Sequence, residues 1–112
     1  MIIEPKYQVI TQSDTTFTLC CHFSNDYPYF AGHFPNFPIL AGVVQLGLVH
    51  QFVQKFLSIS LSKATIRQIK YQRIVPSNST LHLQVDYMPE KKRLDFKWLQ
   101  KDECMSSGVF SL

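Results

Sequence analysis

The sequence of 112 residues lacks charge over one long stretch, residues 27–54, which contain no Asp, Glu, Lys or Arg. Within this stretch His33 stands among prolines and aromatic residues, ahead of Gly42, which opens an apolar helical pattern. Histidine is costly to place in apolar surroundings unless its ring nitrogens are used. A glycine at a helix start leaves backbone N–H groups free to bind an oxyanion. The pattern therefore predicts a base beside an oxyanion hole.

Other features are also missing, and each absence excludes a class of protein. The cysteines are odd in number and show no CxxC spacing, which excludes a disulfide framework and a zinc site and favours a reducing cytoplasm. Cys20 and Cys21 show no evident activating base and are interpreted as packing residues in preference to nucleophiles. The longest apolar run, residues 39–49, is too short for a membrane span. Residues 1–6 lack the basic-then-apolar layout of a signal peptide.

The composition is that of one small globular domain. Hydrophobic residues make up 46% of the chain, enough for a core that oligomerisation would help to stabilise. The net charge is +3, and the basic residues are too few and too little interleaved with aromatics for nucleic-acid binding. The basic residues form two clusters, one of Lys63, Arg67, Lys70 and Arg73 and the other of Lys91, Lys92 and Arg93. These clusters are either solvated surface charges or a binding surface for an acidic partner.

Alternation of apolar and polar residues predicts several strands. Residues 17–23 alternate cleanly and are expected to pair with a strand over residues 7–11 through a turn at Ser13 and Asp14. Residues 65–75 are rich in strand-forming types, but their alternation is imperfect, which suggests a bulge. Further strands are expected over residues 81–87, 94–98 and 105–112. Residues 25–38 carry three prolines and a glycine and read as an ordered, irregular loop.

Between the early and late strands, residues 40–57 form a helix pattern with apolar residues on every side. A helix that is hydrophobic all round is buried all round. In so short a chain this requires a sheet wrapped about a central helix. The predicted class is α+β, with one antiparallel sheet.

This order of elements resembles the hotdog-fold 3-hydroxyacyl-(acyl carrier protein) dehydratases. The likeness covers nearly the whole chain, and the N-terminal helix of the family is expected to be missing here. The motif is Gly32-His33-Phe34-Pro35, then Pro38-Ile39, then Gly42-Val43, with Gln51 further along the helix. Pro28-Tyr29-Phe30 upstream and Ile69-Lys70-Tyr71-Gln72-Arg73-Ile74-Val75-Pro76 downstream also resemble the family. The amino-acid sequence around Gly42 is most similar to that of the divergent ApeI-like branch, which is associated with aryl-polyene and related lipid pathways.

The resemblance implies roles for single residues. His33 would be the base, Gly42 would donate its N–H to the thioester carbonyl, and the Ile39 carbonyl would hold the other ring nitrogen of His33. A fixed N–H at the positive end of a helix suits the charge that builds on the carbonyl oxygen. No metal or redox cofactor is implied, because the phosphopantetheine arm belongs to the substrate. Substrate contacts would come from Phe34, Pro38, Ile39, Val43, Leu46 and Gly47.

The sequence departs from the family at Gly47, where the family has a Glu or Asp that helps to expel the 3-hydroxyl as water. Loss of such a group typically costs a factor of about 100 to 10,000 in rate. His50 lies one turn on, shares the face of position 47 and is the candidate replacement, or else is a core histidine bonded locally. Gln45 should point elsewhere, and Asp26 lies in the loop.

The leading hypothesis is a homodimer, or a dimer of dimers, that dehydrates 3-hydroxyacyl thioesters of acyl carrier protein or coenzyme A. Because Gly47 replaces the acid, two forms of a second hypothesis stay open. The chain is then a non-catalytic binder of acyl thioesters, or the inactive half of a pair with an acid-bearing paralogue. A hotdog thioesterase ranks last, since no carboxyl lies in the first turns of the helix to activate water.

Overall fold

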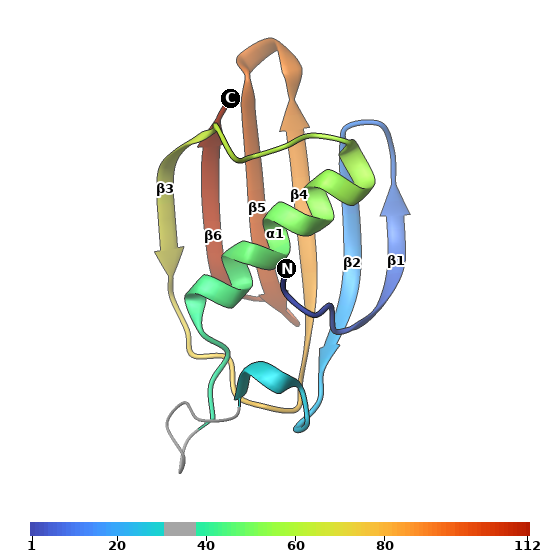
Figure 1. Cartoon of the computed structure of the whole chain (residues 1–112), viewed down its shortest axis with the longest axis vertical. Coiled ribbons are helices and arrows are strands. Elements are labelled where there is room, and N and C mark those ends of the chain that lie inside the picture. The colour runs from blue at the N-terminus through green and yellow to red at the C-terminus, as the bar shows by residue number, and fades with distance from the viewer. Residues whose placement is uncertain (31–37) are drawn as a thin grey trace.

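The computed structural model describes residues 1–30 and 38–112, which form one six-stranded antiparallel sheet with a single α-helix across it (Figure 1). The order across the sheet is β1-β2-β4-β5-β6-β3. His33 and Phe34 lie outside the described residues. The elements along the chain are β1 (Lys6–Gln12), β2 (Thr16–Phe23), the 3-10 helix η1 (Pro28–Phe30), α1 (Gly42–Leu57), β3 (Thr65–Tyr71), β4 (Ser79–Met88), the 3-10 helix η2 (Pro89–Lys91), β5 (Arg93–Gln100) and β6 (Glu103–Ser111).

The alternation seen in the sequence places one face of each central strand in the core. In β2 the buried side chains are Phe17, Leu19, Cys21 and Phe23, as the pattern predicts. The β1–β2 turn is also where it was expected, with the Ser13 N–H donating to the Thr16 carbonyl at 2.8 Å. The core between sheet and helix is completed by Leu81, Leu83, Val85, Leu94, Phe96, Trp98 and Phe110.

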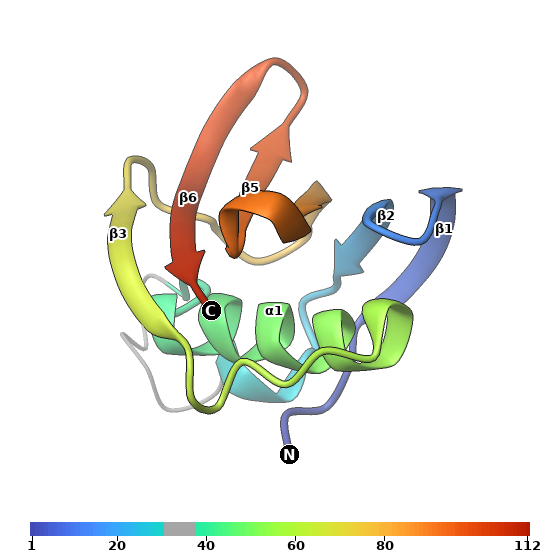
Figure 2. The ribbon, with the colours of Figure 1, turned by 90° about the horizontal axis from the view of Figure 1, so that it is seen from above.

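Helix α1 begins at Gly42 and ends at Leu57, followed by Ser58 in the left-handed conformation with φ 56°. Its sheet-facing side is fully buried at Leu48, Val49, Phe52 and Val53. The prediction that the helix is buried on every side is wrong, because the Val43 side chain is 76% exposed. The curved sheet of one chain covers only one side of the helix, and the N-terminal residues run along the opposite side (Figure 2).

Strand β3 forms one edge of the sheet and is shorter than the sequence suggests. The expected bulge is present between Ile66 and Gln68, in the pairing of β3 with β6. The strand then stops at Tyr71 instead of continuing to residue 75. The reason is that the next two N–H groups, of Gln72 and Arg73, both donate to the Met105 carbonyl, at 2.9 and 3.2 Å. A ladder needs a separate acceptor for each, so the register is lost there.

These features make up the hotdog arrangement, a sheet curled around one helix, that the sequence predicts. No helix in residues 1–30 or 38–112 is long and apolar enough to cross a membrane.

Candidate active site at the start of helix α1

Helix α1 begins at Gly42, the glycine that the sequence analysis selects as the candidate oxyanion donor. Ala41 is extended and caps the helix, and its carbonyl accepts the N–H groups of Val44 and Gln45, each at 3.1 Å. Gly42 is the first helical residue, and no atom of the described residues accepts its N–H. Such first-turn N–H groups lack a partner within the helix and lie at the positive end of its dipole. The Gly42 N–H is therefore a suitable donor for an oxyanion.

Tyr71, at the end of β3, explains why residue 42 is a glycine. A Cβ added to Gly42 would lie 2.6 Å from Cζ of the Tyr71 ring, closer than Cβ atoms approach other atoms. The Tyr71 hydroxyl donates to the Gly42 carbonyl at 3.0 Å, in a partly exposed bond. Burial raises the pKa of Tyr71, so the phenol stays protonated and remains a donor. Tyr71 thus holds the helix start in contact with the sheet edge.

The segment before the helix is fixed to the connection between β3 and β4. The Leu40 N–H donates to the Val75 carbonyl at 2.7 Å, and the Ser77 N–H donates to the Pro38 carbonyl at 3.3 Å. Ile39 forms a β-bridge with Pro76. The contact between the Ile39 carbonyl and His33 lies outside the described residues. Beside this segment is a hollow of about 370 Å³, lined by Ile39, Leu40, Ala41, Gly42, Gln45, Tyr71, Gln72, Arg73, Ile74 and Val75.

Gly47, where the sequence resemblance implies an acid in other members of the family, lies under the N-terminal residues of the same chain. A Cβ added at Gly47 would lie 2.0 Å from Cδ1 of Ile2 and 3.3 Å from its Cγ1. The Ile2 side chain therefore fills the space that a side chain at position 47 would enter. We call this space the Gly47 notch.

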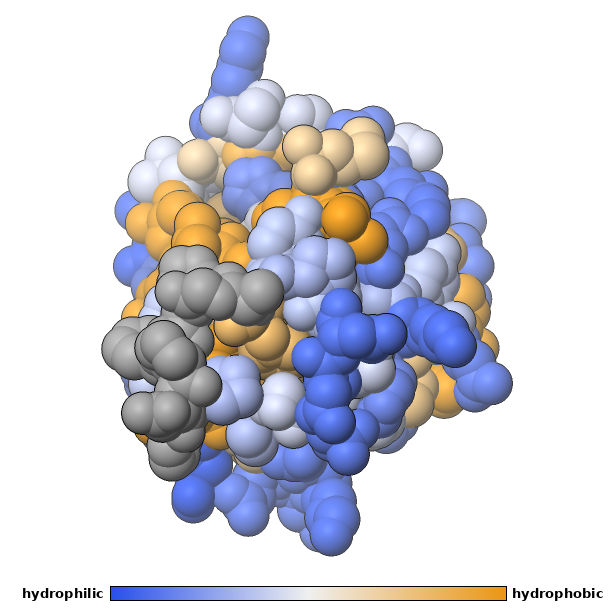
Figure 3. Space-filling model, turned by 60° about the horizontal axis from the view of Figure 1, so that its bottom comes forward, coloured by the Kyte–Doolittle hydropathy of each residue, from blue (hydrophilic) through white to orange (hydrophobic). Residues whose placement is uncertain are grey.

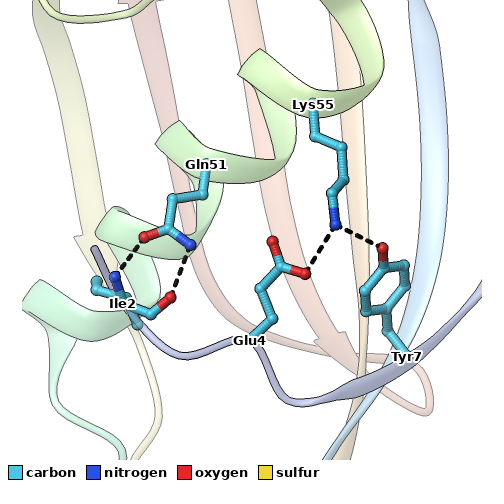
Figure 4. Close-up of polar contacts among 5 residues, drawn as sticks. All are labelled: Ile2, Glu4, Tyr7, Gln51 and Lys55. Atoms are coloured by element: carbon cyan, nitrogen blue, oxygen red, sulfur yellow. Dashed lines mark hydrogen bonds and ion pairs between the residues drawn. The ribbon is translucent and has the colours of Figure 1, made fainter.

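Residues 1–5, which we call the N-terminal strap, are tied down over the notch by hydrogen bonds. Both backbone groups of Ile2 bond the Gln51 side-chain amide, the N–H donating to Oε1 at 2.5 Å and the carbonyl accepting from Nε2 at 2.8 Å (Figure 4). Further along, the Lys55 ammonium donates to the Glu4 carboxylate at 2.9 Å and to the Tyr7 hydroxyl at 3.0 Å.

The loop side of the strap is held as well. The Ile3 N–H donates to the Tyr29 hydroxyl at 2.8 Å, and the Ile3 carbonyl accepts from the Tyr27 hydroxyl at 2.6 Å. The N-terminal strap is thus hydrogen-bonded both to helix α1 and to the side chains of Tyr27 and Tyr29.

His50 does not fill the Gly47 notch, although the two residues are one turn apart. Its ring packs edge-on against Phe110 of β6, with ring centroids 5.6 Å apart. Burial lowers the pKa of His50, which favours the neutral imidazole. A neutral imidazole keeps one N–H but is a much weaker acid than the imidazolium, so His50 is poorly suited as the replacement acid.

The remaining candidates occupy different surroundings. Val43 points to the surface, and Leu46 is partly buried against the core. Gln45 points away from the Gly47 side, as expected, and is buried in the core. Asp26 lies in an exposed loop, where its carboxylate accepts the Ser24 hydroxyl, a bond that lowers its pKa.

The thiol chemistry excluded from the sequence is also disfavoured by the structure. Burial raises the pKa of the Cys21 thiol to about 12, so the nucleophilic thiolate is scarce. Within residues 1–30 and 38–112, no three His, Cys, Asp or Glu side chains gather to hold a metal ion.

Comparison with known proteins places the chain in a family. The model of a family described as ApeI-like, ApeI dehydratase, matches residues 9–109. The chain belongs to this ApeI-like dehydratase family. No curated protein matches it.

Solved structures share the fold. The dehydratase heterocomplex ApeI:P from Xenorhabdus doucetiae includes a chain that is 23% identical, with a TM-score of 0.85 and 97% of each chain covered. An uncharacterized protein from Erwinia carotovora subsp. atroseptica is 28% identical, with a TM-score of 0.73 over 99% of this chain and 94% of that one. A variant of a hypothetical thioesterase from Streptococcus pneumoniae TIGR4 is 12% identical, with a TM-score of 0.66 over 94% of this chain and 87% of that one.

Sequence reasoning missed two residues of this region. It read Tyr71 only as part of a strand, and it assigned nothing to Ile2. An aromatic residue at the end of the strand after the helix was visible, but its contact with Gly42 spans 29 positions. No local pattern marks such a contact.

Proposed function

We propose that this chain takes part in the dehydration of 3-hydroxyacyl thioesters, carried by acyl carrier protein or coenzyme A, to trans-2-enoyl thioesters. The observation that carries the proposal is the Gly42 N–H, which has no acceptor among the described residues and opens the helix of a chain in the ApeI-like dehydratase family. A thioester carbonyl beside this N–H would be polarised at the positive end of the helix.

In the proposed reaction His33 removes a proton from the carbon alpha to the thioester. The electron pair forms the 2,3 double bond while the C3–O bond breaks, and the departing hydroxide takes a proton to leave as water. During this step the Gly42 N–H stabilises the charge on the thioester oxygen. No metal or redox cofactor takes part, and the phosphopantetheine arm comes with the substrate.

The proton for the hydroxide has no evident source in the Gly47 notch, and this favours a second candidate. Ile2 fills the notch with an apolar side chain, and the neutral His50 ring packs on Phe110. In this candidate the chain supplies base and oxyanion donor, and a paralogous partner supplies the acid. The likeness to a chain of a dehydratase heterocomplex supports this arrangement. Without such a partner the chain would bind acyl thioesters and not turn them over.

Association with another chain is part of both candidates, as a homodimer, a dimer of dimers or a heterodimer. The outer edge of β3 has no strand beside it in the described chain, and hydrophobic patches lie among hydrophilic side chains at the lower end of the molecule (Figure 3). Around that edge, large apolar side chains are exposed without cover, namely Val43, Ile66, Tyr71 and Ile74. A cytoplasmic location agrees with three unpaired thiols.

The test is hydration of a trans-2-enoyl thioester by the purified protein. The reaction is monitored as the loss of absorbance of the conjugated thioester. If the chain is active alone, His33→Ala should lower the rate by a factor of about 100 to 10,000. If it is inactive alone but active with an acid-bearing paralogue, the second candidate is supported. Inactivity in both settings, together with unchanged binding of thioester by His33→Ala, would refute both.

Restoring an acid at position 47 sharpens this test, but the Ile2 side chain that occupies the Gly47 notch must be shortened first. Gly47→Glu alone would drive its Cβ into Ile2, so the informative variant is Gly47→Glu combined with Ile2→Ala. Activity gained by this double variant and absent from Ile2→Ala would show that only the acid was missing. Release of free thiol from an acyl thioester would instead revive the thioesterase reading.

A further inference from the structure

Helix α1 carries one amide on its buried side that is hydrogen-bonded at both its nitrogen and its oxygen. Gln45 is only 4% exposed, although its neighbours in the core are apolar. Its Nε2 donates to the Leu40 carbonyl at 3.0 Å, and its Oε1 accepts the hydroxyl of Ser106, which is itself fully buried, at 2.7 Å. The Trp98 indole N–H donates to the Gln45 backbone carbonyl at 3.3 Å. Three elements of the fold meet in this network.

The network is not needed to fill space. A leucine or methionine at position 45 with alanine at 106 would fill the same space and bury no side-chain polar group, but it would leave the Leu40 carbonyl without its donor. Burying an amide and a hydroxyl is costly unless each finds a partner, and replacing both by apolar groups is often nearly neutral. The arrangement is therefore explained by what it orients, and not by stability alone.

What it orients is the peptide just before the helix. The Leu40 N–H is held by the Val75 carbonyl, and the Leu40 carbonyl is held by Gln45. Both polar groups of this residue are thereby fixed, two positions ahead of the Gly42 N–H. The Tyr71 hydroxyl donates a second hydrogen bond, to the Gly42 carbonyl. Gln45 and Tyr71 together leave the helix start little freedom to tilt.

We infer that Gln45 and Ser106 are positioning residues for the oxyanion donor, aiming the Gly42 N–H at the thioester carbonyl. This inference rests on the proposed function. The Leu40 carbonyl can only accept a hydrogen bond, so it requires Nε2 on its side of the amide, and the Ser106 hydroxyl holds the other end by donating to Oε1. The donor itself is a backbone group, and its direction is set by side chains that never touch substrate.

The test uses Gln45→Met and the double variant Gln45→Met with Ser106→Ala, which leaves no buried hydroxyl unpaired. We expect kcat for enoyl-thioester hydration to fall about 10- to 100-fold with KM unchanged, since a misaimed donor weakens transition-state binding. Val53→Ala, a buried change two turns further along the same helix, is the matched control. It should lower stability and leave kcat as it is.

A second readout is independent of turnover. Amide hydrogen exchange at Leu40 should become about fivefold faster in both Gln45 variants, measured relative to the slowest core amides, because one of the two hydrogen bonds that hold the Leu40 backbone is lost. If the folded double variant keeps wild-type kcat, or wild-type exchange at Leu40, the positioning role is overturned. If the wild-type chain shows no turnover with or without a partner, the proposed function fails. The hydrogen-exchange result then decides by itself whether Gln45 restrains the backbone at Leu40.

Discussion

A double-mutant cycle at Gly47 and Ile2 would test whether the strap fills the notch. A mid-helix Gly→Ala change normally stabilises by about 1 kcal/mol. Here the new methyl would lie 2.0 Å from Cδ1 of Ile2, and overpacking typically costs about 1–3 kcal/mol. We therefore expect Gly47→Ala to destabilise the chain by about 1 kcal/mol.

In the Ile2→Ala background the obstruction is gone and the same change should stabilise by about 1 kcal/mol. The coupling between the two positions is then about 2 kcal/mol, within the range for residues in contact. Urea unfolding followed by Trp98 fluorescence gives the four free energies of unfolding, provided that the slopes agree. If Gly47→Ala stabilises both backgrounds equally, Ile2 does not occupy the notch.

Three further predictions concern single groups. Burial lowers the pKa of His50 in the folded chain below its ordinary value of 6.5, so His50 binds a proton more readily in the unfolded chain. His50 therefore lowers the free energy of unfolding as the pH falls from 6.5 through the folded pKa. Urea midpoints of His50→Phe should fall less over that range than those of wild type or of the exposed control His22→Gln; equal slopes would contradict the assignment. Cys21, with its pKa of about 12, should resist iodoacetamide at pH near 8 in the native protein and react after unfolding, as read by peptide mass spectrometry; native labelling would argue against its burial. Tyr71→Phe removes the hydroxyl that bonds Gly42 and should lower the free energy of unfolding by about 0.5–1 kcal/mol in thermal or urea titration, with no change if the bond is not formed in solution.

The features that sequence reasoning placed well are those with a local signal. The alternation from Phe17 to Phe23 sets which face of β2 is buried, and the broken alternation near Ile66 marks a real bulge. The apolar pattern located α1 to within a few residues. These signals are strong because the periods of strands and helices act over neighbouring positions.

What the sequence did not disclose depends on contacts between distant segments. Ile2 bonds Gln51 across 49 positions, and Ser106 bonds Gln45 across 61. The expected full burial of α1 was wrong because the apolar pattern does not say which chain covers each side. Val43 lies on the side of the helix that the sheet leaves uncovered in the described chain.

The two edges of the sheet differ in how they meet solvent, and this bears on aggregation. The β1 edge carries a bulge between Val9 and Thr11, which interrupts the flat row of backbone groups that another strand would need. The β3 edge has its own bulge and charged side chains at Arg67 and Lys70. Bulges and charges of this kind discourage indefinite strand addition. A sheet built this way can accept one well-matched neighbour and still resist growth into a fibril.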